Sequence, residues 1–597
     1  MMPKTLRLAL GLALALSQTL AADELPKTPA ELADFNATPT HAETLEYLEM
    51  LAGASPWIEL TGFGTSPEGR SMPLVIVSSD GHFTPEAARA SGKPIVLVQN
   101  GIHSGEIDGK DASLMLLREV ASGGMRETFE HLILLVIPIY NVDGHERISP
   151  YNRANQDGPV EGMGFRTTTA GYDLNRDHLK VESMEARALI GLFNTWRPHL
   201  HVDNHVTNGS DHGWIFTWSW AEAPQIHPKI DEWFKAHMPF VMALTRQSGY
   251  PTGPYVGLID RNDPSKGMNS WVGQPRYSGG YFPLRQRPSI LVEMHAYKPY
   301  RDRVLALRAF LGHLLDRVSG SGAALVHAVE RAEDHTVALG RPDAEPSEVV
   351  VEWAAHDTGD TVVWPAYAWT HEESQAMGVP ILVFERGVPA AKGEKGLEVP
   401  WIHASKAAKT ATRPRGYVVL PGWPQIEERL AIHGLRTVRV GEATAVDGET
   451  VRVDVAEHSA TPYQGRHRAS GISVERRAGT VTVPPGSLWI PADQPDFEVA
   501  VQLLEPDAPD SLVAWGLVST IFERKEYIDS RMLEELVVDM LKEPAMKAKW
   551  EAALEADDDL SGNPWARWLW WYRQTPYWDD RVGMMPVVRV AAVPEGW

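Results

Sequence analysis

The sequence contains no cysteine in its 597 residues. This absence excludes disulfide cross-links, thiolate catalysis and every zinc site built on cysteine. Any metal ion bound by this chain must therefore be held by histidine, aspartate or glutamate side chains.

Basic residues are also scarce relative to acidic ones. Lysine and arginine number 56 and aspartate and glutamate 78, so the formal net charge is 56 − 78 = −22. Nucleic-acid binding depends mainly on basic groups that contact phosphates. The composition therefore excludes nucleic acid as an expected partner, and the negative charge is explained by solubility.

Long hydrophobic runs are missing except near the start of the chain. There, Lys4 and Arg7 precede an apolar run from Leu8 to Leu16, and small residues follow near Ala21. This is the layout of a secretory signal peptide, and the run is shorter than the roughly 20 apolar residues of a membrane-spanning helix. We predict a signal peptide over residues 1–22, no stable membrane span, and a bacterial protein that is periplasmic or secreted.

The length exceeds what one ordinary core accommodates, so two or more domains are expected. Residues 23–325 alternate between short apolar runs and amphipathic stretches, the pattern of an α/β sheet with helices on both faces. The predicted strands are 72–79, 93–101, 131–144, 198–206 and 287–297, and the main predicted helices are 111–122, 183–196 and 304–320.

The remainder of the chain has a different pattern. Residues 326–505 alternate apolar and polar residues between Gly/Asp turns, which predicts a β-rich accessory region. Residues 506–597 read as a helical, aromatic-rich region that contains "PWARWLWWYRQTPYWDD". Such a cluster is more often core or inter-domain packing than a sugar-stacking or interface surface.

The stretch "NGIHSGEIDGKD" carries the first candidate for chemistry. His103 and Glu106 lie three positions apart, just after a predicted strand, and both side chains are normal zinc ligands. The spacing alone arises often by chance. Asp108 and Lys110 in the same stretch are interpreted as residues of a solvated loop.

A catalytic zinc requires a third protein ligand, and "RPHLHVDNHVTNG" offers one. His201, Asp203 and His205 alternate along a predicted strand and therefore point to one face, with His205 nearest the strand end. Read as a helix instead, His201 and His205 form their own i, i+4 pair, although without the internal glutamate of a helical zinc-protease motif.

Two further groups complete the candidate site. In "GYDLNRDH", Asn175 and Arg176 offer the amide donor and guanidinium fork that suit a carboxylate. Glu293 lies in the apolar strand "SILVEMHAY", where a carboxylate requires a partner or has a raised pKa suited to general base and acid work. A buried structural ion pair is the alternative for Glu293.

The order of these motifs resembles the zinc carboxypeptidases of the carboxypeptidase A type (funnelins), over roughly residues 40–320. The resemblance implies a mixed, mostly parallel twisted sheet, one Zn²⁺ per chain and a peptide substrate with a free C-terminal carboxylate. It implies the metal ligands His103, Glu106 and His205, and Glu293 as general base and acid toward a metal-activated water. It further assigns Asp173 to orienting His103, Asn175, Arg176 and Tyr277 to binding the substrate, and Arg166 to polarising the scissile carbonyl.

Some assignments stay open. Arg153 competes with Arg166 and Tyr281 with Tyr277, and Asp260, Arg261 and Asp263 are candidates for the specificity pocket. The family's serine after the third ligand is Val206 here, and His295 follows Glu293 closely. Other readings are an amidase or deacylase, a peptidoglycan stem-peptide carboxypeptidase, or a non-catalytic binding protein. The oligomeric state is left open.

Overall fold

In a computed structural model, the chain is described over residues 25–207, 211–270, 273–390, 396–594 and 597. The predicted signal peptide lies outside these residues. Contacts divide the chain into two units, one holding Met1–Ala332 and Trp353–Lys406 and the other Glu333–Glu352 and Ala407–Trp597. The sequence-based boundaries at residues 325 and 505 remain predictions. Among the described residues, no helix has both the length and the apolar character needed to cross a bilayer.

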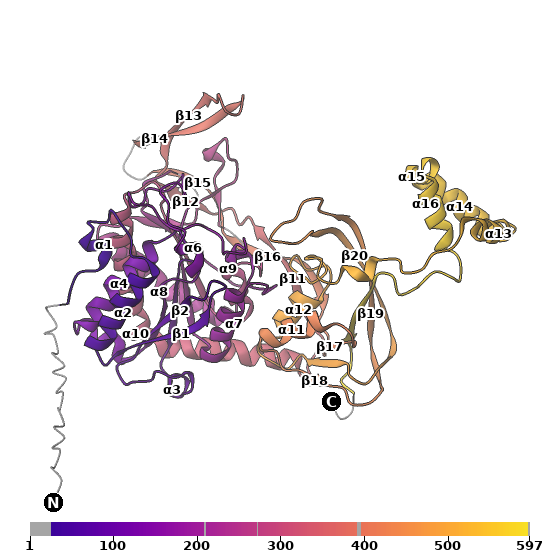
Figure 1. The fold of residues 1–597 in the computed structure, drawn as a ribbon, viewed down its shortest axis with the longest axis horizontal. Coiled ribbons are helices and arrows are strands. Elements are labelled where there is room, and N and C mark those ends of the chain that lie inside the picture. Colours follow the sequence, from indigo (N-terminus) through magenta and orange to yellow (C-terminus); the bar gives the residue numbers. More distant parts are fainter. Residues whose placement is uncertain (1–24, 208–210, 271–272, 391–395, 595–596) are drawn as a thin grey trace, which may run out of the picture. The chain divides into compact units, whose positions relative to one another are not determined.

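The first unit is built on an eight-stranded mixed sheet (Figure 1). In spatial order its strands are β1 (Ile58–Thr65), β2 (Ser71–Val77), β4 (Ile133–Ile137), β3 (Ile95–Asn100), β5 (Leu200–Val206), β10 (Ser289–Met294), β6 (Phe216–Trp220) and β7 (Thr252–Pro254). The central strands β4, β3, β5 and β10 run parallel to one another. At one side β1 and β2 join antiparallel, and at the other side β6 is antiparallel to β10 and parallel to β7. Parallel central strands bring their carboxyl ends to a common edge, where functional groups gather.

Helices cover both faces of this sheet, as predicted. Alternate strand residues such as Val96, Val98 and Val202 pack into one core with helices α2 (His41–Ala54), α4 (Asp108–Ala121), α8 (Pro228–Gln247) and α10 (Tyr300–Gly340). On the opposite face, Phe282 of α9 (Ser278–Leu284) contacts the ring of His201 at 4.1 Å, and Phe193 of α7 (Met184–Trp196) contacts Phe282. The α/β prediction is confirmed. The central strands β3, β4 and β5 are buried along their whole length because helices cover both faces of the sheet.

Helix α10 is longer than the sequence indicated. The prediction ended it at residue 320, because "SGSG" (319–322) reads as a helix end, but it runs for 41 residues. Leu325, Val329 and Ala332 beyond this stretch are buried in the core and hold the helix together. A Cβ at Gly322 would lie 2.3 Å from Pro94 Cγ, so this glycine permits close packing rather than ending the helix.

Smaller elements complete the first unit. Its remaining helices are α1 (Pro29–Leu32), α3 (Pro85–Ala90), α5 (Arg126–Glu130), α6 (Val142–His145), and the 3₁₀ turns η2 (Leu174–Arg176) and η3 (Pro264–Lys266). A four-stranded sheet has the order β12 (Thr361–Trp364), β15 (Leu397–Ile402), β9 (Met268–Asn269) and β8 (Gly257–Leu258). Strands β13 (Tyr367–Glu373) and β14 (Pro380–Pro389) form a hairpin. Strands β11 (Glu348–His356) and β16 (Ala404–Thr412) pair with each other, and each has residues in both units.

The second unit contains a six-stranded sheet, which confirms a β-rich region after the α/β fold. Its strand order is β18 (Val438–Arg439), β21 (Leu488–Pro491), β17 (Gly416–Val419), β22 (Met584–Val590), β19 (Thr444–His458) and β20 (Ala469–Val483). Its helices are α11 (Pro424–Ile432), α12 (Phe497–Leu504), η4 (Ser519–Phe522), α13 (Ser530–Met540), α14 (Pro544–Ala556), α15 (Asp558–Gly562) and α16 (Pro564–Tyr572). Strand β22 was not predicted: the chain returns from the helices to pair between β17 and β19.

Candidate active site

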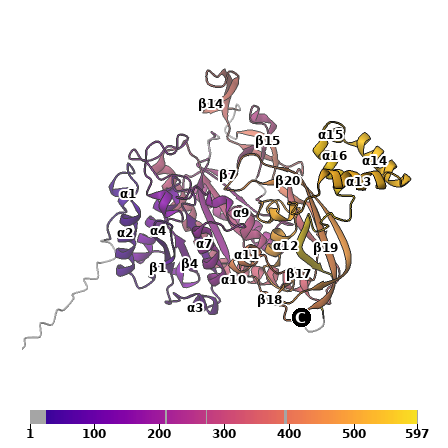
Figure 2. The same cartoon turned by 45° about the vertical axis from the view of Figure 1, so that its right-hand side comes forward.

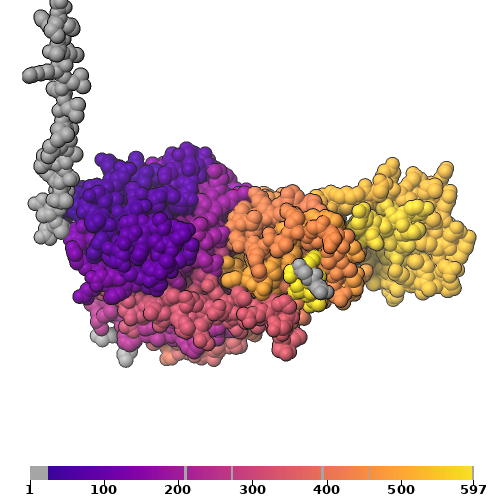
Figure 3. All heavy atoms as spheres, turned by 90° about the horizontal axis from the view of Figure 1, so that it is seen from below, coloured from indigo at the N-terminus to yellow at the C-terminus, as the bar shows by residue number. Residues whose placement is uncertain are grey.

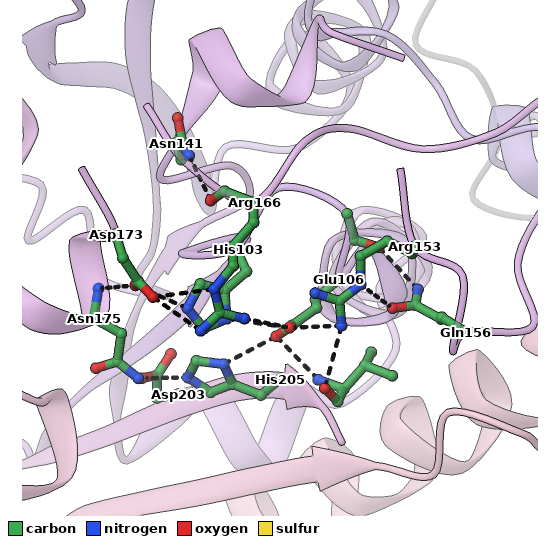
Figure 4. A network of polar contacts seen from close by, with 12 residues as sticks. His103, Glu106, Asn141, Arg153, Gln156, Arg166, Asp173, Asn175, Asp203 and His205 are labelled. Atoms are coloured by element: carbon green, nitrogen blue, oxygen red, sulfur yellow. Dashed lines mark hydrogen bonds and ion pairs between the residues drawn. The ribbon is translucent and has the colours of Figure 1, made fainter. Parts of the chain in front are cut away.

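His103, Glu106 and His205 converge at the carboxyl edge of the central sheet (Figure 4). His103 and Glu106 lie in the turn between β3 and α4, and His205 lies near the end of β5. Because β3 and β5 are parallel neighbours, with Asn100 paired to Asn204, the turn and the strand end meet. One ligand atom from each residue lies within 4.8 Å of the others, and all three side chains are buried.

Both histidine rings are oriented in the same way. His103 Nδ1 lies 3.1 Å from Glu106 Oε1, and His205 Nδ1 lies 3.0 Å from Glu106 Oε2. The opposite nitrogens face carboxylates, with His103 Nε2 at 3.0 Å from Asp173 and His205 Nε2 at 2.8 Å from Asp203. Ligand atoms around a tetrahedral zinc are roughly 3.3 Å apart, and metal-bound histidines commonly pair their second nitrogen with a carboxylate. The donor set and its spacing therefore fit zinc.

Asp203 was not assigned a role from the sequence, although it was placed on the same strand face as His205. Besides His205, it accepts a hydrogen bond from Ser278 Oγ at 2.5 Å. Burial opposes its ionisation, but the His205 ring holds the pKa of Asp203 well below its usual range. The period-two spacing of Asp203 and His205 was the signal for this partnership.

The turn between the first two candidate ligands requires a glycine. A Cβ at Gly105 would lie 2.7 Å from the Gly164 carbonyl oxygen and 2.8 Å from Arg153 Cγ. The backbone of "HSGE" therefore approaches a neighbouring loop more closely than any side chain permits. This close approach helps to hold His103 and Glu106 in a tight turn.

Glu293 stands beside His205 on the neighbouring strand. Strands β5 and β10 are parallel, and Glu293 is in register with His205, so both side chains project from the same face. Glu293 Oε2 is buried without a hydrogen-bond partner among the described residues. Burial raises the pKa of Glu293 to about 7. These are the surroundings of a carboxylate that can exchange a proton near neutral pH.

A pocket of about 210 Å³ opens onto these groups. Its lining residues are His103, Glu106, Arg166, Asn175, Arg176, His205, Val206, Tyr255, Tyr277, Leu291 and Glu293. Arg176 lies over the ring of Tyr277, with Cζ 4.4 Å from the ring centroid. Asn175 Oδ1 accepts a hydrogen bond from Ser278 N, which leaves the amide NH₂ as the remaining donor of that side chain. The predicted carboxylate-binding residues thus share one wall.

The two candidate arginines occupy different places. Arg153 Nη2 lies 2.8 Å from Glu106 Oε1, its Nε donates to Gln156, and its side chain is largely buried. Arg166 lines the pocket, is partly exposed, and donates from Nε and Nη2 to Asp173 Oδ2 at 3.0 and 2.9 Å. Arg166 therefore faces the space available to a substrate, whereas Arg153 supports Glu106.

Several residues considered from the sequence lie elsewhere. Tyr281 is buried, and its hydroxyl accepts a hydrogen bond from Arg285. Asp260 and Arg261 are exposed on the surface, and neither they nor Asp263 are among the residues that line the pocket. His295 is buried at 3.2 Å from Asp211.

The solvated-loop interpretation of Asp108 and Lys110 is wrong, because each is only 1% exposed. Asp108 pairs with Arg303, and Lys110 Nζ lies 3.0 Å from His145 Nε2. The sequence held no local signal of their long-range partners.

The helical reading of His201 is also wrong: Leu200–Val206 is a strand, and His201 Nδ1 contacts Ser289 Oγ at 2.9 Å. Tyr255 and Leu291, by contrast, line the pocket without having been predicted.

Comparison with protein families agrees with this geometry. Residues 44–203 match the family model described as zinc carboxypeptidase. Residues 44–203 therefore belong to a zinc carboxypeptidase domain, which supports a zinc peptidase, a hydrolase with zinc as its cofactor. The matched residues end two positions before His205, so the tertiary structure, and not the match, brings His205 and Glu293 to the site.

The chain is similar to fungal proteins over most of its length. Carboxypeptidase 2 of Trichophyton rubrum is 22% identical over 503 residues, which cover 81% of this chain and 85% of that protein. Carboxypeptidase 2 of Trichophyton equinum is 22% identical over 508 residues, covering 82% and 86%. Both relatives are named as carboxypeptidases.

Among solved structures, a metallo-carboxypeptidase from Burkholderia cenocepacia is 16% identical with a TM-score of 0.36, and covers 47% of this chain and 70% of that one. Carboxypeptidase A from Helicoverpa armigera is also 16% identical with a TM-score of 0.36, and covers 51% and 79%.

Proposed function

We propose that this protein removes single residues from the free C-terminus of peptides, with His103, Glu106 and His205 holding one zinc ion. The observation that carries the proposal is the composition of one pocket. A carboxylate-binding wall of Asn175 and Arg176 faces the same space as the three candidate ligands and Glu293. A substrate gripped by its terminal carboxylate thus presents its last peptide bond to the catalytic groups.

Each protein group has a defined part in this reaction. Zinc, when bound, supplies a Lewis acid that lowers the pKa of water and polarises a carbonyl. Glu293 accepts a proton from the attacking water and returns it to the leaving amine. Arg166, on the pocket wall, donates hydrogen bonds to the carbonyl oxygen as negative charge develops there. Asp173 and Asp203 orient the two histidine rings through their Nε2 atoms.

The remaining wall of the pocket supports a preference for an apolar C-terminal side chain. Leu291 precedes Glu293 by two residues and projects from the same face of β10, so it lies deeper in the site. Val206 and Tyr255 add apolar surface to the lining. The predicted signal peptide supports an exported enzyme that meets its peptide substrates in the periplasm or outside the cell.

Metal removal combined with a change at the substrate terminus tests the function. We expect hydrolysis of an N-blocked dipeptide that ends in phenylalanine or leucine to stop with a chelator and to return with added zinc. The same dipeptide with a C-terminal amide should not be cut, because the amide offers no carboxylate to Arg176. Zinc-dependent cleavage of the amide and the acid at equal rates would instead support an amidase. A protein that contains zinc but hydrolyses no dipeptide, amide or cell-wall peptide would support the alternative of a non-catalytic binding protein.

A substitution of Arg176 tests the carboxylate clamp. The Arg176→Ala variant should raise KM about 10- to 100-fold for substrates with a free terminus, because a charge-assisted, two-pronged interaction is lost. Zinc content should stay unchanged. Arg153→Ala is the informative comparison, since Arg153 contacts Glu106 and should alter zinc affinity more than KM. An unchanged KM for Arg176→Ala contradicts the assignment.

A further inference from the structure

The aromatic-rich stretch near the C-terminus belongs to a small helical bundle of α13–α16 (Figures 1 and 2). Trp571 and Tyr572 are buried with Leu533 and Val537, and further tryptophans of the stretch pack against this core. Core packing therefore accounts for most of the cluster. The space-filling view shows the bundle, in yellow, as a packed lobe (Figure 3).

Three aromatic side chains of the bundle and its leading segment remain outside this core. Tyr527, Trp565 and Tyr577 are 76%, 73% and 64% exposed. Tyr527 and Tyr577 line the same groove of about 300 Å³, although they lie 50 positions apart in the chain. The groove is thus formed by tertiary packing of the segment before α13 and the segment after α16.

Helix α13 presents two different faces. Leu533 and Val537 are buried in the core of the bundle. Met532, Glu535 and Leu536 line the groove, together with Ile528 and Asp529 at the start of the helix. The i, i+3, i+4 spacing of a helix places these two sets on adjacent faces. The groove face combines apolar floor residues with carboxylates, whereas the inner face is apolar only.

The charge of the groove has one sign. Its seven lining residues include Asp529 and Glu535 and no basic residue. Three arginines close in sequence to the groove residues have other partners: Arg524 lies over Trp568, Arg573 lies over Trp578, and Arg581 pairs with Asp579. Arg531, between Asp529 and Met532, is exposed and is not one of the lining residues. The two carboxylates can form ion pairs with a cation, and the two exposed tyrosine rings can form cation–π interactions with it.

We propose that this groove binds a polypeptide segment in which lysine or arginine alternates with apolar side chains. The apolar floor of Ile528, Met532 and Leu536 takes the apolar side chains, and Asp529, Glu535 and the tyrosines take the cationic ones. A second copy of this chain is the less favoured occupant, because its formal net charge is −22. The groove lies in the second unit, so the proposal is independent of the catalytic assignment.

The test measures binding of a short peptide of alternating lysine and leucine to the full-length protein at low ionic strength. Its N-terminus is acetylated and its C-terminus is amidated, so that the proposed carboxylate clamp does not select it. The control peptide replaces every lysine by glutamate. We expect saturable binding of the lysine peptide, weaker binding as salt is added, and no measurable binding of the glutamate peptide.

Matched variants locate the binding. Asp529→Asn removes a charge but keeps a good helix N-cap, because the Asp529 side chain accepts a hydrogen bond from Arg531 N. Asp529→Asn and Glu535→Gln should each raise Kd about two- to fivefold, and Tyr577→Ala by a similar factor. Glu534→Gln and Trp565→Ala change an exposed carboxylate and an exposed aromatic outside the groove and should leave Kd unchanged.

Three outcomes overturn the proposal. Equal binding of the lysine and glutamate peptides would show that the charge of the peptide does not determine binding. Equal effects of the groove variants and their controls place the binding elsewhere. Binding of a cell-wall oligosaccharide that depends on Tyr577, without binding of the lysine peptide, makes the groove a sugar-stacking site. Hydrolysis of blocked dipeptides should be the same for all five variants, which separates this result from any failure of the proposed enzyme function.

Discussion

Replacement of Glu293 by glutamine should lower kcat by about 10³-fold while the protein keeps its zinc. Glutamine preserves the size of the side chain and its place on β10 but cannot accept a proton from water. Glu293 is not one of the three grouped ligand residues, so metal content by elemental analysis should equal that of the wild type. Activity near the wild-type rate would show that another group acts as the base.

The pH profile adds a second readout for the same residue. A general base works in its ionised form, so kcat/KM should rise with pH as Glu293 loses its proton and should level off above its pKa. Burial raises that pKa to about 7, and the positive charge of a bound zinc ion would lower it again. We therefore expect kcat/KM of the wild type to fall as the pH decreases below a midpoint at or below about pH 7. The small residual activity of Glu293→Gln should not show this fall. The same fall in the variant would show that another group causes it.

Replacement of Arg303 by methionine should destabilise the first unit by about 3–5 kcal/mol, the usual cost of leaving a buried charge without its partner. Arg303 is fully buried, with Nε 2.7 Å from Asp108 Oδ2 and Nη2 3.1 Å from Asp108 Oδ1. Its Nη1 also donates to the carbonyl oxygens of Ala296 and Lys298. It thus links the start of α4, beside Glu106, to the segment that follows Glu293.

Denaturant unfolding of the variant and of matched controls measures this effect. Arg301→Met removes an exposed arginine of the same helix and should cost less than about 1 kcal/mol. Adding Asp108→Asn to Arg303→Met should recover part of the loss, because no buried charge then remains. A small effect of Arg303→Met alone would show that the pair is not needed for stability.

The pH dependence of Arg303→Met has a definite sign. Burial already raises the pKa of Asp108, even with Arg303 beside it. Without Arg303, the folded-state pKa lies further above the unfolded value of about 3.9. The folded variant then binds more protons than the unfolded chain, so its stability falls as pH rises through that window. A variant whose stability relative to wild type does not change with pH would contradict this account.

Local sequence signals were reliable for the central strands. The runs around Ile95–Asn100, Ile133–Ile137 and Ser289–Met294 are continuous and apolar because these strands are covered on both faces. Alternation in "HVDNHV" placed His201, Asp203 and His205 on one face, because side chains of a strand alternate regardless of the fold around it. Strand β22 and the second half of α10 escaped prediction, since distant packing partners determine both.

Polar residues in loops were harder to interpret. Asp108 and Lys110 look like members of a solvated turn, and Asp260, Arg261 and Asp263 look like pocket residues, because a charged residue has the same local pattern in either place. Burial of Asp108 depends on Arg303, which is 195 positions away in the chain. No local pattern contains that partnership.

By itself, the sequence determined the class of chemistry: the lack of cysteine left histidine and carboxylate ligands, and the order of the motifs from His103 to Glu293 indicated a zinc carboxypeptidase. Only the tertiary structure decided which arginine and which tyrosine face the pocket, that Asp203 orients His205, and that Leu291 and Tyr255 line the site. The reason is physical. Ligand types and strand faces follow from residue identity and short-range periodicity, whereas the lining of a pocket depends on which distant segments the packed core brings to the same sheet edge.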